Sequence, residues 1–418
     1  MTSGGEAAAP RAPRAWTVPL RKLAQANVAV VTLLSVVSAL VLGAVLIIAT
    51  TPAVLHAIGH IGSHPGRALG LTGAAVGDAY WAMFSGAIFS PSALGHVVST
   101  GHGWVALFTP LSETLVSATP LVLAGLGVAI GFSTGVFNIG AQGQLIAGAL
   151  AALYVGFEVQ LPIGIHVPLV LLAGAAGGAA AGFVPGFLKA RTGAHEVITT
   201  IMFNYVMLNL LDYLLSVSPF QQPGQSNAIS RTMPATARLP HLFGSGLRAN
   251  VGLLVALAAV AGAAWFTRRS TLGFSFRVIG LNPAAGKTAG IDARRVTVLV
   301  LVISGALAGL AGTASLAGTD FFLSSGYGGN IGFDAITVAL LGRNRPVGVL
   351  FAGLLFGALD VGGRNMQAVT GIPLDLASVI QALIVMFVAT PVLVREIFRL
   401  RGGGGGSSLQ LATGGWGG

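Results

Sequence analysis

The 418-residue sequence contains no cysteine and few charged residues. Without cysteine, the chain can form neither disulfides nor thiolate metal sites. Asp, Glu, Lys and Arg make up 8% of the residues, whereas soluble proteins average about 25%. Because 54% of the residues are hydrophobic, the chain cannot cover itself with polar groups in water. The alternation typical of membrane β-barrels is also missing, so the sequence predicts an all-α, polytopic membrane protein.

The formal net charge of +10 would by itself suggest a nucleic-acid partner. Lys and Arg instead form short clusters between apolar runs, as they do in cytoplasmic loops of membrane proteins. Residues 267–295 are the strongest case, with one acid, Asp292, against Arg268, Arg269, Arg277, Lys287, Arg294 and Arg295. We therefore expect a cytoplasmic loop at 267–295, membrane lipid around the apolar runs and no nucleic-acid partner.

Apolar segments long enough to cross a bilayer, which takes about 20 helical residues, recur along the chain. They cover residues 28–49, 114–132, 138–156, 167–188, 197–217, 250–267, 296–318 and 376–394. With the interrupted segments described below, they predict a bundle of about 8–10 transmembrane helices. Counting from the loop at 267–295 gives an even number of spans, with both termini in the cytoplasm and residues 51–112 and 218–249 outside.

The two ends of the chain do not resemble membrane segments. Residues 1–22 are rich in Ala, Pro and Gly with scattered basic residues, and we expect them to form a cytoplasmic tail. Residues 402–418 are rich in Gly and Ser and carry too little apolar surface to fold, which predicts a flexible tail. The membrane domain is therefore expected to span residues 23–401.

Two apolar regions are interrupted by residues that break helices. Residues 331–341 and 347–359 are each short and are separated by Gly342, Arg343, Asn344, Arg345 and Pro346, which predicts a broken or re-entrant pair of helices. Residues 131–144 are interrupted as well, and Leu-Ala-Gly-Leu occurs at both 123–126 and 307–310. Paired interruptions of this kind indicate transport sites, because non-helical backbone inside a membrane must be buried or line a cavity.

Neutral polar side chains gather at the first interruption. A helix that begins near Asn138 directs free amides into the break, and Asn138, Gln142 and Gln144 add uncharged hydrogen-bonding groups. These groups suit a neutral, hydroxylated solute, although amides also join helices to one another in lipid. Asp334 begins a short helix, where we expect capping of free amides ahead of solute binding. The predicted pathway residues are Phe137, Asn138, Gln142, Gln144, Asn204 and Asp334.

Several motifs suggest a nucleotide-binding, metal-binding or catalytic site but lack a feature that such a site needs. GLNPAAGKTAG at 280–290 resembles a phosphate-binding loop, but five residues instead of four separate Gly280 from Gly286. His56, His60 and His64 repeat at helical spacing, yet glycines and Pro65 weaken a helix there. No serine, histidine and acid stand together in a context that would anchor a catalytic site. We therefore expect no metal, no cofactor and no enzymatic activity.

Four stretches identify a family resemblance over about residues 110–395. They are TGVFNIGAQGQ at 134–144, TGAHEVITTIMFNY at 192–205, LGFSFRVIGLNPAAGKTAGI at 272–291 and GFDAITVALLGRNRPVGV at 332–349. Together they resemble ABC-importer permeases of the branched-chain amino acid, ribose and nucleoside branch, and nucleoside and simple-sugar permeases most of all. One difference is Gln142, where many relatives carry Glu, so a charge at that position cannot be essential here.

The resemblance implies that residues 23–401 form a permease domain and that the loop at 267–295 couples it to an ATPase. The implied coupling residues are Arg277, Gly280, Asn282, Pro283, Ala285, Ala289, Gly290 and Ile291. Implied partners are two ATP-binding cassette subunits that hydrolyse ATP, a second permease in a heterodimer and an extracytoplasmic solute-binding lipoprotein. The expected function is alternating-access import of a nucleoside or simple sugar across a bacterial cytoplasmic (inner) membrane. An ion-coupled secondary transporter and a permease for branched-chain amino acids are the alternatives.

Overall fold

The computed structural model describes residues 28–244, 246–390, 394 and 396–398. The described residues form helices and no β-strand, apart from isolated bridges in the loop at 221–250 and between Ile229 and Ser324. This confirms the prediction of an all-α protein. The predicted tails at 1–22 and 402–418 lie outside the described residues. The chain divides into two units, of which one contains residues 47–381 and the other contains the segments before and after them.

The smaller unit combines α2 (Val28–Thr50), up to residue 46, with the end of α16 (Leu374–Ala389). A buried hydroxyl joins the two helices, because Ser35 Oγ donates to the Phe387 carbonyl at 3.1 Å. Ser35 of α2 therefore hydrogen-bonds to a residue 352 positions later in the chain.

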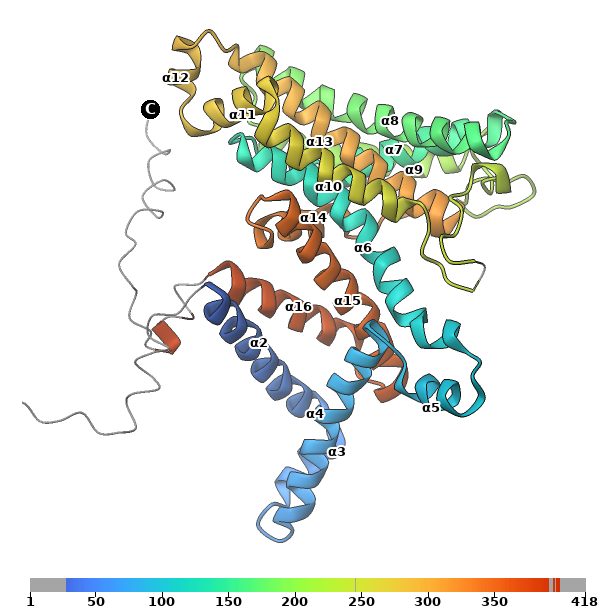
Figure 1. Ribbon diagram of the computed structural model, residues 1–418, viewed down its shortest axis with the longest axis vertical. Helices are drawn as coiled ribbons and strands as arrows, with labels where there is room; N and C mark the ends of the chain where they lie inside the picture. Colours follow the sequence, from blue (N-terminus) through green and yellow to red (C-terminus); the bar gives the residue numbers. More distant parts are fainter. Residues whose placement is uncertain (1–27, 245, 391–393, 395, 399–418) are drawn as a thin grey trace, which may run out of the picture. The chain divides into compact units, whose positions relative to one another are not determined.

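The larger unit is built around long helices that pack through glycines. These helices are α6 (Trp104–Ser133), α7 (Ala141–Glu158), α8 (Ile163–Thr192), α9 (Glu196–Leu215), α10 (Gly252–Arg269) and α13 (Ala293–Ser315). Figure 1 shows α6, α8, α10 and α13 running alongside one another. Glycines of α8 and α13 meet so closely that a Cβ on Gly178 would lie 2.1 Å from the Gly305 carbonyl oxygen. Small residues at these crossings allow the helix backbones to touch.

Seven helices in the described part of the chain are long and apolar enough to cross a membrane. They include α2, α6, α8, α9, α10, α15 (Pro346–Thr370) and a span from Ala293 to Asp320 that ends in a π-helical turn, η3 (Leu316–Asp320). The polytopic prediction is therefore confirmed. Helices α7 and α16 cover most of the predicted span at 138–156 and the part of 376–394 up to residue 389, but α7 carries two glutamines and α16 has only 16 residues.

Residues 51–112, which were expected to be an external loop, are largely helical. They contain α3 (Pro52–Gly59), α4 (Pro65–Ala87), α5 (Pro91–Thr100) and the first turns of α6. Proline stands at the first position of α3, α4 and α5, where its missing amide costs nothing. The sequence did not predict these helices, because only membrane spans were sought and these helices are too polar or too short to be recognised as spans; the prediction that this region lies outside is separate and stays a prediction.

The predicted interruption at 342–346 is present as a tight turn between α14 (Ile331–Leu341) and α15. Arg343 and Asn344 turn the chain with φ angles of 54° and 55°, a left-handed conformation that non-glycine residues rarely adopt. The second helix, however, is 25 residues long instead of a short partner. The helix continues to Thr370, and Asn365 near its end hydrogen-bonds to α4 instead of ending the helix.

Candidate functional site

The first interruption is an irregular segment at residues 134–140, between α6 and α7. Gly135 has a φ of 75°, and the Gly131 carbonyl accepts from both Thr134 and Val136 amides, which ends α6. Asn138 Oδ1 then accepts from the Gly140 amide at 3.0 Å, just before α7 begins. The chain is therefore not helical at residues 136–140, and the Asn138 side chain accepts a hydrogen bond from the backbone there.

Asn138 is the centre of a buried cluster that reaches α13. Its Nδ2 donates to Gln144 Oε1 at 2.8 Å and to Ser304 Oγ at 2.7 Å, while Gln144 Nε2 donates back to Asn138 Oδ1 at 3.2 Å. All three side chains are fully buried in the chain. Hydrogen bonds in such a dry environment are strong, and leaving one group without a partner is costly.

Two further amides attach neighbouring helices to the same segment. Asn204 on α9 accepts from the Gly143 amide at 2.8 Å and donates to the Ile139 carbonyl at 2.9 Å. Gln142 on α7 accepts from the Gly332 amide of α14 at 2.8 Å and donates to the Tyr327 carbonyl at 3.3 Å. In this conformation the amides join helices to one another, which is the alternative role considered for them from the sequence.

The two remaining predicted pathway residues are not held in this way. Phe137 is 52% exposed, and its ring contacts that of Phe132 at a tilt of 56°, with ring centroids 5.3 Å apart. Asp334 is half-buried in α14, and capping by its side chain does not occur. The capping prediction was wrong because α14 begins at Ile331 and Asn330 occupies the N-cap position, so Asp334 lies within the first turn and not at the start of the helix.

A repeated motif marks the true counterpart of the first break. Asn-Ile-Gly-Ala-Gln at 138–142 recurs as Asn-Ile-Gly-Phe-Asp at 330–334, and the hydrogen bond from Gly332 to Gln142 places the two motifs in contact. The break at 134–140 is therefore paired with the irregular segment at 321–330, and not with 342–346. Aligning the chain with itself around Asn138 would have revealed this pair.

Replacing Asn138 with alanine is expected to lower the thermal stability of the protein. The change leaves Gln144 and Ser304 buried without their partner, which costs about 3 kcal/mol for two unsatisfied groups. A thermal unfolding curve of the detergent-solubilised protein measures the loss. Asn227→Ala, in an exposed loop, is the matched control, and equal melting temperatures for the two variants would contradict a stabilising role for the cluster.

The basic segment at 267–295 folds into two short helices, α11 (Thr271–Leu281) and α12 (Pro283–Thr288). A polar side chain caps the start of each one. Ser270 Oγ accepts from the Gly273 amide at 2.8 Å, and Asn282 Oδ1 accepts from Ala284 and Ala285 amides at 3.0 and 3.1 Å. Asp292 caps α13 in the same way. The start of each helix in this segment is thus specified by neighbouring residues in the sequence.

Gly290 ends α12 in a left-handed conformation, with a φ of 76°. The Ile291 amide donates to the Gly286 carbonyl at 2.9 Å and the Gly290 amide to the Lys287 carbonyl at 3.0 Å. This pair of bonds is the Schellman arrangement, for which glycine is the favoured residue. The turn therefore fixes the angle at which α12 leaves the surface.

Most of the predicted coupling residues lie on the outer surface of this segment. Arg277, Gly280, Asn282, Pro283, Ala285, Ala289 and Gly290 are exposed, and Ile291 is half-buried. Leu281 and Phe274 beside them are 79% and 55% exposed, which makes the surface apolar as well as basic. We call these residues, from Phe274 to Ile291, the coupling surface. Such apolar exposure is typical of a surface that another protein covers.

The coupling surface lies directly against the first break. A Cβ on Gly280 would lie 2.4 Å from the Ser133 carbonyl oxygen, so α11 touches the end of α6 by backbone contact. The Arg277 guanidinium donates to the Thr267 carbonyl and thereby joins α11 to α10. No flexible side chain separates the two backbones at this contact.

Comparison with known proteins agrees with the resemblance found in the sequence. The family described as the permease component of branched-chain amino acid transport systems matches residues 111–389. The chain is 39% identical to the guanosine ABC transporter permease protein NupP of Bacillus subtilis, over 72% of this chain and 89% of that protein. It is 37% identical to the nucleoside ABC transporter permease protein NupB of Lactococcus lactis, over 68% and 80%.

A sugar permease is similar to a comparable degree. The glucose ABC transporter permease protein TsgB13 of Haloferax volcanii is 38% identical over 67% of this chain and 76% of its own length. No solved structure gives a significant match to the chain. The region that matches the family, residues 111–389, contains both breaks and the coupling surface.

Proposed function

Since this chain belongs to the family of permease components of branched-chain amino acid transport systems, we propose that it provides the path of an ATP-driven importer for a nucleoside or simple sugar. It is a transport subunit and not an enzyme, and ATP is hydrolysed by separate subunits. The contact between Gly280 and Ser133 is the observation that carries the mechanism, because it connects a surface made for a partner with the break in the membrane.

In this mechanism, closure of two ATP-binding subunits moves the coupling surface. The contact with Ser133 passes this displacement to residues 134–140, and the Asn138 cluster passes it to α13. Gln142 extends it to α14 and Asn204 extends it to α9. Phe137 and Asp334, the two accessible members of the predicted pathway, are the residues proposed to contact the moving solute.

The assembly proposed around the chain has four kinds of partner, with the chain embedded in membrane lipid. They are two ATP-binding cassette subunits, a second permease in a heterodimer, an extracytoplasmic solute-binding lipoprotein and the small-molecule solute. The membrane is proposed to be the cytoplasmic (inner) membrane of a bacterium, crossed several times, with residues 1–22 and 402–418 and the coupling surface on the cytoplasmic side. The basic residues of 267–295 support this orientation.

A neutral, hydroxylated cargo is supported by two observations. The relatives are named for guanosine, nucleosides and glucose, and the polar groups around the first break are uncharged amides instead of ions. A branched-chain amino acid, which is a zwitterion, would find the Asp334 carboxylate for its ammonium group but no basic side chain among the predicted pathway residues for its own carboxylate.

Uptake by the reconstituted transporter tests the proposal. Proteoliposomes with both permeases, the ATPase subunits and the binding protein should accumulate labelled uridine or glucose only when ATP is supplied to the ATPase side. Accumulation of leucine instead would assign the cargo to branched-chain amino acids. Uptake by the purified chain alone, driven by a proton or sodium gradient, would make it a secondary transporter.

Gly290 offers a second test of the coupling surface. Gly290→Leu forces a branched side chain into a left-handed turn, which costs about 1 kcal/mol, and adds bulk where α12 meets its partner. We expect uptake per ATP hydrolysed to fall, whereas Gly290→Asn should retain most of it, because asparagine tolerates this conformation. Equal coupling ratios for the two variants would show that the turn does not position α12.

A further inference from the structure

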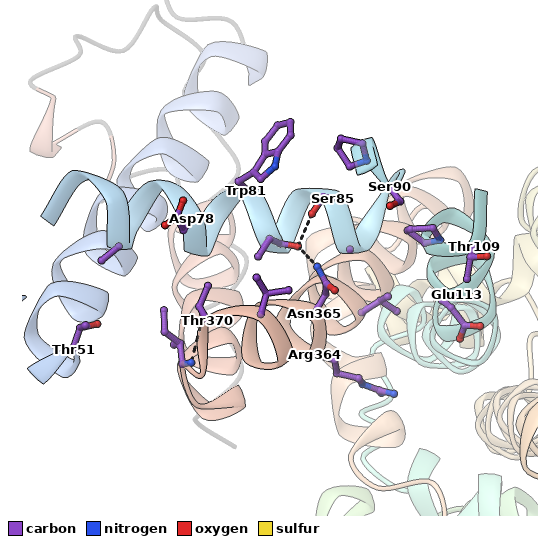
Figure 2. A pocket seen from close by; sticks show the side chains of 18 residues that line it. Thr51, Asp78, Trp81, Ser85, Ser90, Thr109, Glu113, Arg364, Asn365 and Thr370 are labelled. Atoms are coloured by element: carbon purple, nitrogen blue, oxygen red, sulfur yellow. Dashed lines mark hydrogen bonds between the residues drawn. The ribbon is translucent and has the colours of Figure 1, made fainter. Parts of the chain in front are cut away.

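A cavity of about 920 Å³ lies between α4, the start of α6 and the end of α15, away from both the break and the coupling surface. Small-molecule sites commonly measure about 300–1,000 Å³. Figure 2 shows its polar lining around the place where α4 and α15 cross. The polar lining includes Asp78, Ser85, Glu113, Arg364 and Asn365.

The floor of the cavity is rigid. Asn365 Nδ2 donates to the Ala82 carbonyl at 2.7 Å, and Ser85 Oγ donates to the same carbonyl at 3.2 Å. Gly86 lets the helices approach so closely that a Cβ there would lie 2.2 Å from Asn365 Cβ. Asn365 Nδ2 and Ser85 Oγ thus each have one hydrogen bond within the protein, and the oxygen of the Asn365 amide remains as an acceptor.

The charged groups of the lining are neutralised, with one exception. Arg364 makes two bonds to Asp360, at 2.7 and 3.3 Å, and Arg248 pairs with Glu113 at 3.0 Å. Asp78 is exposed in the cavity and forms neither an ion pair nor a side-chain hydrogen bond with any residue that the structure describes. The cavity therefore presents one carboxylate, that of Asp78, without a partner among the described residues.

Such a lining selects for ligands that donate hydrogen bonds. An anion would meet the carboxylate of Asp78, whereas the two oxygens of that carboxylate match two neighbouring hydroxyl groups of a sugar ring. Trp81, at the rim and 56% exposed, adds an apolar face of the kind that sugar rings and bases contact. The chemistry thus fits a neutral polyol or a ribonucleoside.

We propose that this cavity, the α4–α15 cavity, is an external receiving site that binds the hydroxyl groups of the solute through Asp78 before the solute enters the pathway. The inference rests on the proposed function and on the prediction from the sequence that residues 51–112 lie outside. The site gives the permease a selectivity for hydroxylated solutes of its own, in addition to that of the binding protein.

Equilibrium binding to the permease and ATPase complex in nanodiscs, without the binding protein, tests the site. The probe is whichever of uridine and glucose the complete transporter imports, compared with 2′,3′-dideoxyuridine or 2-deoxyglucose. Asp78→Asn is expected to weaken binding of the probe about tenfold, the effect of losing a hydrogen bond to a charged group. The deoxy analogue should bind the unmodified complex about as weakly. Glu158→Gln, an exposed carboxylate at the end of α7 outside the cavity, should bind the probe normally.

A second pair of variants tests the cavity by its volume. Ala75→Phe fills it, whereas Gly77→Phe adds the same ring to the same helix at a position with no neighbour within 4 Å. We expect Ala75→Phe alone to raise the KM of uptake at unchanged kcat.

If the transporter imports the probe but Asp78→Asn and Ala75→Phe behave as the unmodified protein, the receiving site is wrong and the proposed function stands. If the complete transporter imports neither probe, the proposed function fails and the receiving site with it.

Discussion

Arg277→Glu is expected to reduce ATP-driven uptake on the order of tenfold or more, the effect of breaking a charge contact at an interface. Arg277 is exposed at the centre of the coupling surface, where a negative charge would repel any acidic group of the ATPase. The change also removes the bond to the Thr267 carbonyl, which holds α11 against α10. Uptake of labelled solute by proteoliposomes, measured together with ATP hydrolysis, separates the two effects.

The ratio of uptake to hydrolysis is the informative quantity. Loss of uptake with persisting hydrolysis shows that the ATPase runs without moving the permease, whereas loss of both indicates that the complex has fallen apart. Arg191→Glu reverses an equally exposed charge at the end of α8, outside the coupling surface, and should leave the ratio unchanged. Normal uptake by Arg277→Glu would remove Arg277 from the coupling surface.

The parts of the fold that were predicted correctly depend on local sequence. The positions of α2, α8 and α13 were predicted from their apolar runs, because a helix must have an apolar run of a certain length to cross a bilayer. The capping residues Ser270, Asn282 and Asp292 fix α11, α12 and the start of α13 within a few positions. The coupling surface was therefore recognisable from the sequence, both in its boundaries and in its exposure.

The roles of the polar residues at the break could not be predicted in the same way. Gln142 finds its acceptor and donor partners 185 and 190 positions away, at Tyr327 and Gly332. An amide that will hold two helices together and an amide that will face a solute look identical in the sequence. The helices α3 to α5 were missed for a related reason, since α4 owes its position to contacts with α15 and not to its own hydropathy.

The same limit applies to the 61 glycines of the chain. Their abundance predicts close helix packing in general, but it does not reveal which glycines touch another backbone. Gly309 and Gly262 both lie inside long helices, α13 and α10. A Cβ on Gly309 would lie 2.2 Å from the Gly174 carbonyl oxygen and 2.9 Å from Gly178 Cα, whereas a Cβ on Gly262 has nothing within 4 Å.

Gly309→Val is therefore expected to destabilise the protein by about 3 kcal/mol or more, the upper range for overpacking. The atoms it meets belong to the backbone of α8, which cannot rotate away as a side chain can, so α8 and α13 must separate along their length. Gly262→Val adds the same side chain to a helix of similar character and should cost less than about 1 kcal/mol. The yield of folded protein in size-exclusion chromatography and the midpoint of thermal unfolding compare the two.

Because Ser304 of α13 also holds Asn138, separation of these helices should release the first break as well, so any Gly309→Val protein that survives should have lost uptake. Equal stability of the two valine variants would mean that the glycine contacts between α8 and α13 do not hold this bundle together.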